Sequence, residues 1–216
     1  MSDQTSRIDS IDHSSEGPNV CLVRAGRRRW RVRASEAEKF NPGDEVQTEV
    51  LDHAGALAKA HDAAMKLLAR APMSAAALQA RLEKRFGADV AVPIVEHLTQ
   101  LGVLNDAEAG RSLLRSLERG GPVGTRRLEQ ALVQHQIDPK AAAQVLEDHA
   151  QARSPSEGAL VAARDMLQSM KRLDSPTQAR RLAGRLGRRG FDMQTVQDTL
   201  DQLGLGEADS EYNPAQ

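Results

Sequence analysis

The chain has 216 residues, a formal net charge of -1 and one cysteine. A single cysteine excludes an intramolecular disulfide and a cysteine metal cluster, so we expect a reducing compartment. The sequence has no run near the roughly 18 apolar residues of a membrane span, and its start lacks the apolar core of a signal sequence. We therefore expect a cytoplasmic protein that makes no membrane contact.

The first 52 residues predict a tail and then a small module that contains β-structure. Residues 1–18 are polar and show no periodicity, which is typical of a disordered tail. Residues 19–52 contain two short strand patterns, 20–23 and 27–34, separated by Ala25-Gly26. Two such runs around a glycine predict a β-hairpin.

The second strand of this hairpin carries an alternation of charge. Side chains alternate across a strand, so Trp30 and Val32 should share one face. The opposite face should hold Arg27, Arg29, Arg31 and Arg33. These arginines are candidates for binding a partner or a phosphate, although charge on an edge strand also protects against aggregation. Both interpretations remain open.

Residues 53–206 are helical in pattern, and a unit of about fifty residues occurs three times within them. The recurring apolar positions are Leu78, Leu82 and Leu98, then Leu128, Leu132 and Leu146, then Leu182, Leu186 and Leu200. Tandem units of this length bury their apolar faces on one another. We predict a mainly α protein with three tandem three-helix repeats in an elongated array, preceded by the β-hairpin module. The predicted segments are repeats at 53–104, 105–153 and 154–206, and a disordered tail at 207–216.

Each repeat has a candidate N-cap before its middle helix. Ser74, Thr125 and Ser175 precede the three helices, and hydroxyl side chains at this position accept hydrogen bonds from free backbone N–H groups. Pro176 stands at the favoured first position of the third helix.

The middle helix of the third repeat contains the densest group of basic residues. At about 100° per residue the arginines occupy one half of this helix, and alanine and leucine the other half. The arginines are Arg180, Arg181, Arg185, Arg188 and Arg189. Arginine suits phosphates and carboxylates, so this face is a candidate for binding a partner or phosphate. A solvated face without a partner is the alternative.

The equivalent helix of the second repeat begins with Arg126 and Arg127. If the repeats stack with similar rotations, these two arginines and those of the third repeat line one surface. The other interpretation is that each set faces water separately. The rotation between repeats cannot be read from the sequence.

The sequence contains no motif for catalysis, for a cofactor or for a metal. The histidines lack the ligand spacing of a metal site, and no glycine-rich phosphate loop or nucleophile elbow occurs. We therefore expect a binding protein that is not an enzyme, with no cofactor and no metal site, and we expect it to be a monomer.

Four segments match a known family pattern in order and spacing: residues 63–74, residues 101–106, residues 121–132 and the run Arg188-Arg189-Gly190-Phe191-Asp192. Together they resemble the RecX family, the bacterial regulators of the RecA recombinase. The chain departs from the family pattern at Asn105, where the family has an acid, and at Ala109-Gly110, where it tends to have an aromatic residue and an alanine.

The resemblance implies a regulatory function without chemistry. A RecX-type protein would lie in the groove of a RecA filament on single-stranded DNA and modulate the recombinase, with inhibition as the expected effect, and it would thereby affect DNA recombination and repair. Single-stranded or duplex DNA is a further candidate partner. The rival interpretation is a DNA-binding protein whose units act like helix-turn-helix motifs. The last helices of the units, around Val95, Gln144 and Gln197, carry little basic charge, which disfavours this rival.

Overall fold

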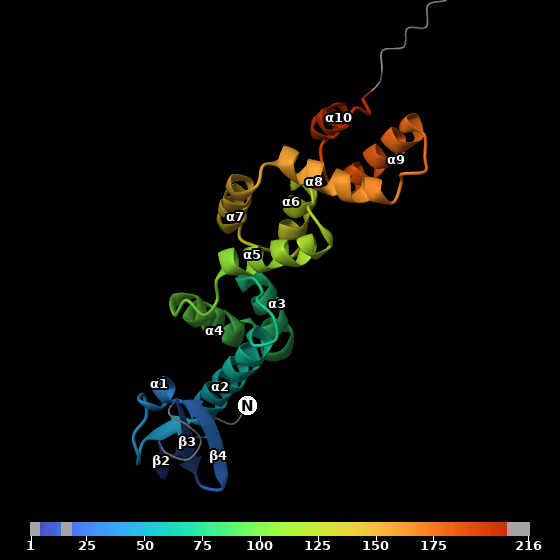
Figure 1. Ribbon diagram of the computed structural model, residues 1–216. Coiled ribbons are helices and arrows are strands. Elements are labelled where there is room, and N and C mark those ends of the chain that lie inside the picture. Colours follow the sequence, from blue (N-terminus) through green and yellow to red (C-terminus); the bar gives the residue numbers. More distant parts are fainter. Residues whose placement is uncertain (1–4, 14–18, 207–216) are drawn as a thin grey trace, which may run out of the picture. The chain divides into compact units, whose positions relative to one another are not determined.

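A computed structural model describes residues 5–13 and 19–206 of the chain (Figure 1). The described residues are mainly helical, with a small antiparallel sheet near the N-terminus. The chain divides into two compact units, Met1–Asn105 and Asp106–Gln216. The mainly α fold with an N-terminal β-hairpin module is therefore confirmed.

The first unit begins with five short strands. They are β1 (Thr5–Arg7), β2 (Ser10–Asp12), β3 (Val20–Ala25), β4 (Arg28–Arg33) and β5 (Glu45–Gln47). Strands β2, β3 and β4 form one antiparallel sheet, and β1 pairs with β5. The predicted hairpin is β3 and β4, joined by a two-residue turn in which Gly26 has φ 58°. Trp30 and Val32 are buried together, as the alternation predicted.

The prediction of a disordered tail over residues 1–18 is wrong for residues 5–13, which contain β1 and β2. Ile8 explains the order, because its side chain is 1% exposed in the core of the module. The backbone of Ile8 also accepts from the Gly43 N–H at 2.8 Å and donates to the Asp44 carbonyl at 2.9 Å. Residues 1–4, 14–18 and 207–216 lie outside the described part.

Helix α2 (Thr48–Leu68) belongs to two cores. Its first turns place Leu51 and Ala54 against the sheet, where Trp30 Nε1 also donates to Asp52 Oδ1 at 2.6 Å. The short helix α1 (Ala34–Ala37) lies over the same core. The later turns of α2 pack against α3 and α4. One continuous helix thus runs through the boundary that we predicted at residue 53.

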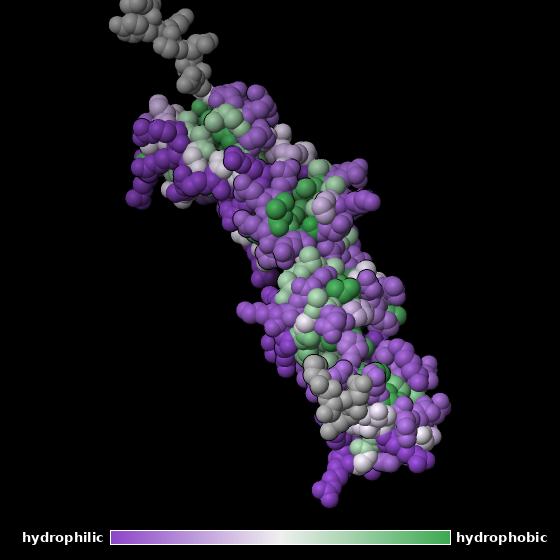
Figure 2. All heavy atoms as spheres, turned by 180° about the vertical axis from the view of Figure 1, so that it is seen from behind, coloured by the Kyte–Doolittle hydropathy of each residue, from purple (hydrophilic) through white to green (hydrophobic). Residues whose placement is uncertain are grey.

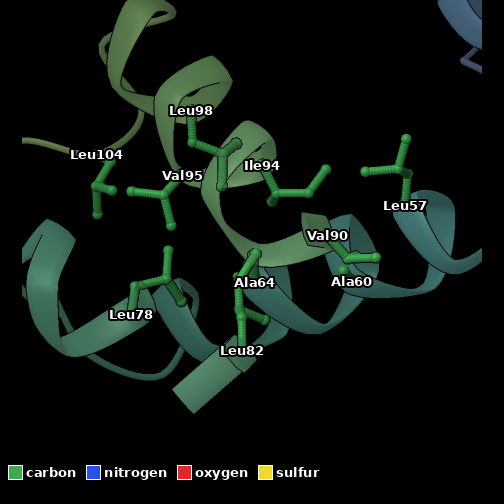
Figure 3. Packing of buried hydrophobic residues seen from close by; sticks show 11 residues of the cluster. Leu57, Ala60, Ala64, Leu78, Leu82, Val90, Ile94, Val95, Leu98 and Leu104 are labelled. Carbon is green, nitrogen blue, oxygen red and sulfur yellow. The ribbon is translucent and has the colours of Figure 1, made fainter. Parts of the chain in front are cut away.

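The first three-helix group consists of α2, α3 (Ala75–Phe86) and α4 (Ala88–Gln100). Figure 3 shows its core, which contains Leu78 and Leu82 from α3 and Ile94 and Leu98 from α4. All four leucine and isoleucine side chains are at most 1% exposed. The leucine spacing noted in the sequence is therefore the spacing of core contacts.

Replacing Ser74 with alanine should reduce the free energy of unfolding by about 1 kcal/mol. Ser74 is 1% exposed, and its Oγ accepts from the Ala77 N–H at 3.2 Å at the start of α3. Urea denaturation of the full chain measures the loss. The control is Ser156→Ala, an exposed position, where we expect a change within about 0.5 kcal/mol. Equal effects would mean that the cap of α3 contributes nothing.

The second unit contains two further three-helix groups. The first is α5 (Asp106–Leu117), α6 (Thr125–Gln134) and α7 (Pro139–Ala152), with the short 3-10 helix η1 (Glu118–Gly120) before α6. The second is α8 (Pro155–Gln168), α9 (Ser175–Arg188) and α10 (Met193–Gln202). Each group has its own core, around Leu128 and Leu132 in the first and Leu182 and Leu186 in the second.

Two of the three predicted N-caps are wrong. Ser74 caps α3 as expected, but Gly124 is the N-cap of α6 and makes no side-chain cap. Asp174 replaces Ser175 as the N-cap of α9, and its carboxylate accepts from the Thr177 N–H at 3.1 Å. A carboxylate caps as well as a hydroxyl and interacts favourably with the helix dipole.

The visible surface in Figure 2 is dominated by hydrophilic residues, with smaller hydrophobic areas between them. Within residues 5–13 and 19–206, none of the helices has the length and hydropathy that a membrane span requires.

Candidate partner-binding surface

A groove in the second unit brings together arginines from two repeats. It lies between α6 and the end of α9 and has a volume of about 470 Å³. Arg126 and Arg127 line it from α6, and Arg188 lines it from α9. All three side chains are exposed. Three of the arginines predicted from the sequence therefore share one concave surface, which we call the arginine groove.

The remaining lining of the arginine groove is uncharged. Leu117, Gln130, Ala131 and Gln134 contribute side chains, while Gly187 and Gly190 contribute backbone. None of the described residues that line it is acidic, so no carboxylate there competes with an anionic ligand. Guanidinium groups and amide N–H groups all donate hydrogen bonds. The arginine groove is therefore suited to phosphates or carboxylates.

Sequence reasoning missed the two glutamines, although a signal was present. Arg126, Gln130 and Gln134 are spaced four residues apart, and residues at this spacing lie on one face of a helix. Charge alone marked α6 in the sequence, and an uncharged amide gives no charge signal. Amides next to arginines add hydrogen-bond donors with direction, which charge alone does not provide.

A close backbone contact sets the position of α6 relative to α9. The Gly124 N–H donates to the Arg189 carbonyl at 2.9 Å. A β-carbon at Gly124 would lie 2.1 Å from the Gly190 carbonyl carbon, and one at Gly190 would lie 2.5 Å from Cβ of Arg127. Glycine is therefore required on both sides, because any side chain would separate the two backbones.

Arg189 contributes to this junction and lies outside the lining of the arginine groove. Its guanidinium donates from Nη1 to the Pro122 carbonyl at 3.2 Å and from Nη2 to the Gly120 carbonyl at 2.7 Å. These two bonds tie the end of α9 to the loop before α6. The structure thus gives Arg189 a positioning contact, which helical periodicity could not reveal.

The other three arginines of α9 lie outside the groove lining. Arg180 and Arg181 are exposed, and Arg185 donates from Nη1 to Ser169 Oγ at 3.2 Å. They occupy the solvent side of α9, opposite the buried Leu182 and Leu186. They add positive charge to the exposed side of α9 outside the arginine groove.

The hairpin arginines lie in the first unit and differ from one another. Arg27 is in the turn, and Arg29 is exposed on β4. Arg31 forms an ion pair with Asp62 of α2, and Arg33 Nη2 lies 2.5 Å from His97 Nε2 of α4. Two of the four therefore contact the first three-helix group, which the sequence alone did not indicate.

The arginine groove offers binding without acid–base chemistry. Arginine keeps its proton throughout the physiological range, and glutamine does not titrate, so neither can act as a general acid or base there. Among the described residues, no three His, Cys, Asp or Glu side chains are placed to hold a metal ion. The chemistry of the arginine groove is therefore that of hydrogen bonding and charge.

The fold and the arginine groove define a class of protein: a mainly helical protein of successive three-helix groups with a cationic groove on its surface. No family model matches the chain. The regulatory protein RecX of Chlorobium phaeobacteroides is 30% identical over 146 residues, which cover 67% of this chain and 93% of that protein. The regulatory protein RecX of Trichlorobacter lovleyi is 31% identical over 147 residues, or 65% of this chain and 92% of that protein. The chain belongs to the RecX family of regulatory proteins.

Solved structures agree at the level of the fold. A crystal structure of a regulatory protein RecX superposes with a TM-score of 0.72 at 15% identity, covering 91% of this chain and 99% of the other. A crystal structure of RecX from Lactobacillus salivarius gives a TM-score of 0.61 at 17% identity, covering 69% of this chain and 97% of the other. The resemblance noted in the sequence is confirmed.

Proposed function

We propose that this protein regulates a RecA recombinase by binding in the groove of its nucleoprotein filament, and that the arginine groove is part of the contact surface. Membership of the RecX family supports the partner. The observation that carries the contact surface is the meeting of Arg126, Arg127 and Arg188 in one hollow without an acidic neighbour in its lining. A filament on single-stranded DNA presents phosphates and acidic side chains, and arginine binds both.

The mechanism we propose is competition and altered filament stability. A protein bound along the filament groove occupies the space that a second DNA strand needs, which inhibits strand exchange. Binding to several recombinase subunits would also change how fast they leave the filament. Both effects come from binding energy alone, so the protein would carry out no reaction and need no cofactor. We propose that it acts as a monomer.

The basic test compares three ligands at the same salt concentration. The purified full-length protein is mixed with a RecA filament on single-stranded DNA, with the same DNA without RecA, and with duplex DNA, and binding is followed by fluorescence anisotropy. We expect the tightest binding to the filament, together with inhibition of strand exchange. Sequence-dependent binding to duplex DNA without RecA would contradict the proposal and favour a helix-turn-helix protein.

The proposal also predicts a salt dependence. Charge contacts at the protein surface are screened, and release of counterions from nucleic acid lowers affinity as salt rises. Binding to the filament should therefore weaken steadily when potassium chloride is raised from about 0.05 to about 0.2 M. An affinity that stays constant over this range would mean that apolar contacts dominate and that the arginine groove does not bind the filament.

A further inference from the structure

The first unit has a second basic hollow, separate from the arginine groove. It is bounded by residues of β3, β4, α1, α2 and α4 and has a volume of about 390 Å³, far above the roughly 10–15 Å³ that one water requires. Its charged and titratable lining is Arg31, Arg33, His61, Asp62 and His97. We propose that this hollow binds a phosphate group, either free in solution or in a nucleic-acid backbone. The proposal does not depend on the regulatory function proposed above.

Arg33 is the main reason for proposing an anion. Its Nη2 lies 2.5 Å from His97 Nε2. Arginine remains protonated, so the imidazole nitrogen must accept and His97 is neutral in this arrangement. Among the described residues, no carboxylate lies within ion-pair distance of Arg33. A guanidinium bound only to a neutral ring keeps its positive charge available for a ligand.

The charges around the hollow come from three elements and do not cancel. Strand β4 contributes Arg31 and Arg33, α2 contributes His61 and Asp62, and α4 contributes His97. Asp62 is paired with Arg31. Among the described lining residues, two guanidinium groups thus accompany one carboxylate, so this lining has one more positive than negative charge even when both imidazoles are neutral. A phosphate would meet donors from β4, α2 and α4 at once, and arginine binds phosphate through a planar fork.

The two histidines add a response to pH. Their ring centroids are 6.5 Å apart. Burial, and then the charge of Arg33, lower the pKa of both imidazoles, while Asp62 partly opposes this for His61. A bound anion favours the protonated form and raises the pKa of both rings. Anion binding should therefore be tightest at a pH below the pKa that the two imidazoles have in the empty site. It should weaken as the pH rises through the higher pKa that they have when the anion is bound.

The experiment follows the ring resonances of His61 and His97 by NMR in the full-length protein. Inorganic phosphate, a short oligothymidylate and sulfate are titrated separately. Sulfate has the shape of phosphate and keeps its charge between about pH 5 and 8, so it isolates the titration of the histidines in the range where imidazole changes charge. We expect saturable shifts of both rings, and with sulfate a rise in the pKa of both and tighter binding at lower pH.

Matched arginine variants identify the site. Arg33→Gln should lower the affinity for the anion at least tenfold. The control is Arg24→Gln, because Arg24 is an exposed arginine on the neighbouring strand β3. This control should keep the affinity within about twofold of the parent protein, since an isolated surface charge contributes little. His97→Gln, which removes a ring and keeps a polar side chain, should also weaken binding. It serves as the second test if Arg33→Gln does not fold, and circular dichroism checks folding in each case.

The outcomes distinguish a free phosphate from a backbone phosphate, and they include results that would contradict the proposed site. Saturation by inorganic phosphate without competition from the oligonucleotide indicates a free anion, whereas tighter binding of the oligonucleotide indicates a backbone phosphate. Either result supports the site. Shifts that never saturate, or equal losses in Arg33→Gln and Arg24→Gln, would overturn it, because both indicate general screening of surface charge.

Discussion

A triple variant in which glutamate replaces Arg126, Arg127 and Arg188 is expected to bind a RecA filament about 100-fold more weakly than the parent protein. Three lost contacts of about 1 kcal/mol each reduce the binding free energy by about 3 kcal/mol. About 1.4 kcal/mol corresponds to a factor of ten in affinity. The three side chains are exposed around one groove. Their replacement should therefore leave the thermal midpoint nearly unchanged, since exposed substitutions affect stability little. Fluorescence anisotropy with labelled filament measures the affinity. The triple variant should also inhibit strand exchange less than the parent protein does.

The control for this variant changes the net charge by the same amount elsewhere. Lys140, Arg164 and Arg172 are exposed and lie outside the lining of the arginine groove. Their triple replacement by glutamate should weaken binding to the filament only a few-fold, through the long-range field that steers association. If both triple variants lose affinity equally, the protein responds to net charge and the arginine groove is not the contact surface.

Replacing Gly124 with alanine is expected to destabilise the second unit by about 3 kcal/mol, the upper end of the usual cost of overpacking. The added β-carbon would lie 2.1 Å from the Gly190 carbonyl carbon and 2.2 Å from the Phe191 nitrogen. Both atoms are backbone, so α6 and α9 must move apart. The bond from the Gly124 N–H to the Arg189 carbonyl would then be lost. Calorimetry or urea denaturation measures the change.

The control is Gly187→Ala, in α9. A β-carbon at Gly187 would meet nothing within 4 Å, and alanine favours a helix over glycine by about 1 kcal/mol. This variant should therefore be more stable than the parent protein. A destabilised Gly187→Ala together with a neutral Gly124→Ala would show that the close backbone contact does not hold the two helix groups together. Gly124→Ala should also weaken filament binding, because the arginine groove depends on the spacing of α6 and α9.

The apolar skeleton of the protein was accessible from the sequence. Leu82, Leu132 and Leu186 each occupy the same place in a recurring pattern, and each is at most 1% exposed in its own core. Burial of such side chains is local in its cause, because the periodicity of a helix or strand decides which positions share a face. The same reasoning placed Trp30 and Val32 together in the hairpin.

The candidate site was only partly accessible. The sequence indicated that α6 and α9 carry arginines, but it did not show that Arg188 would meet Arg126 and Arg127 while Arg189 would bind backbone carbonyls. Helical periodicity places Arg188 and Arg189 on the same half of α9. Their different contacts depend on how the next helix group packs, which no local pattern records.

By itself the sequence determined the helical repeats, the buried face of each element and the arginine content of α6 and α9, because each follows from the spacing of side chains along one helix or strand. Only the tertiary structure decided the rest. Tertiary contacts of Ile8, including its hydrogen bonds to the loop before β5, order residues 5–13. Helix α2 joins the β-hairpin module to the first three-helix group. The close backbone contact at Gly124 and Gly190 brings α6 and α9 together and so forms the arginine groove. These features arise where residues distant in the chain meet, and such meetings are set by packing between elements.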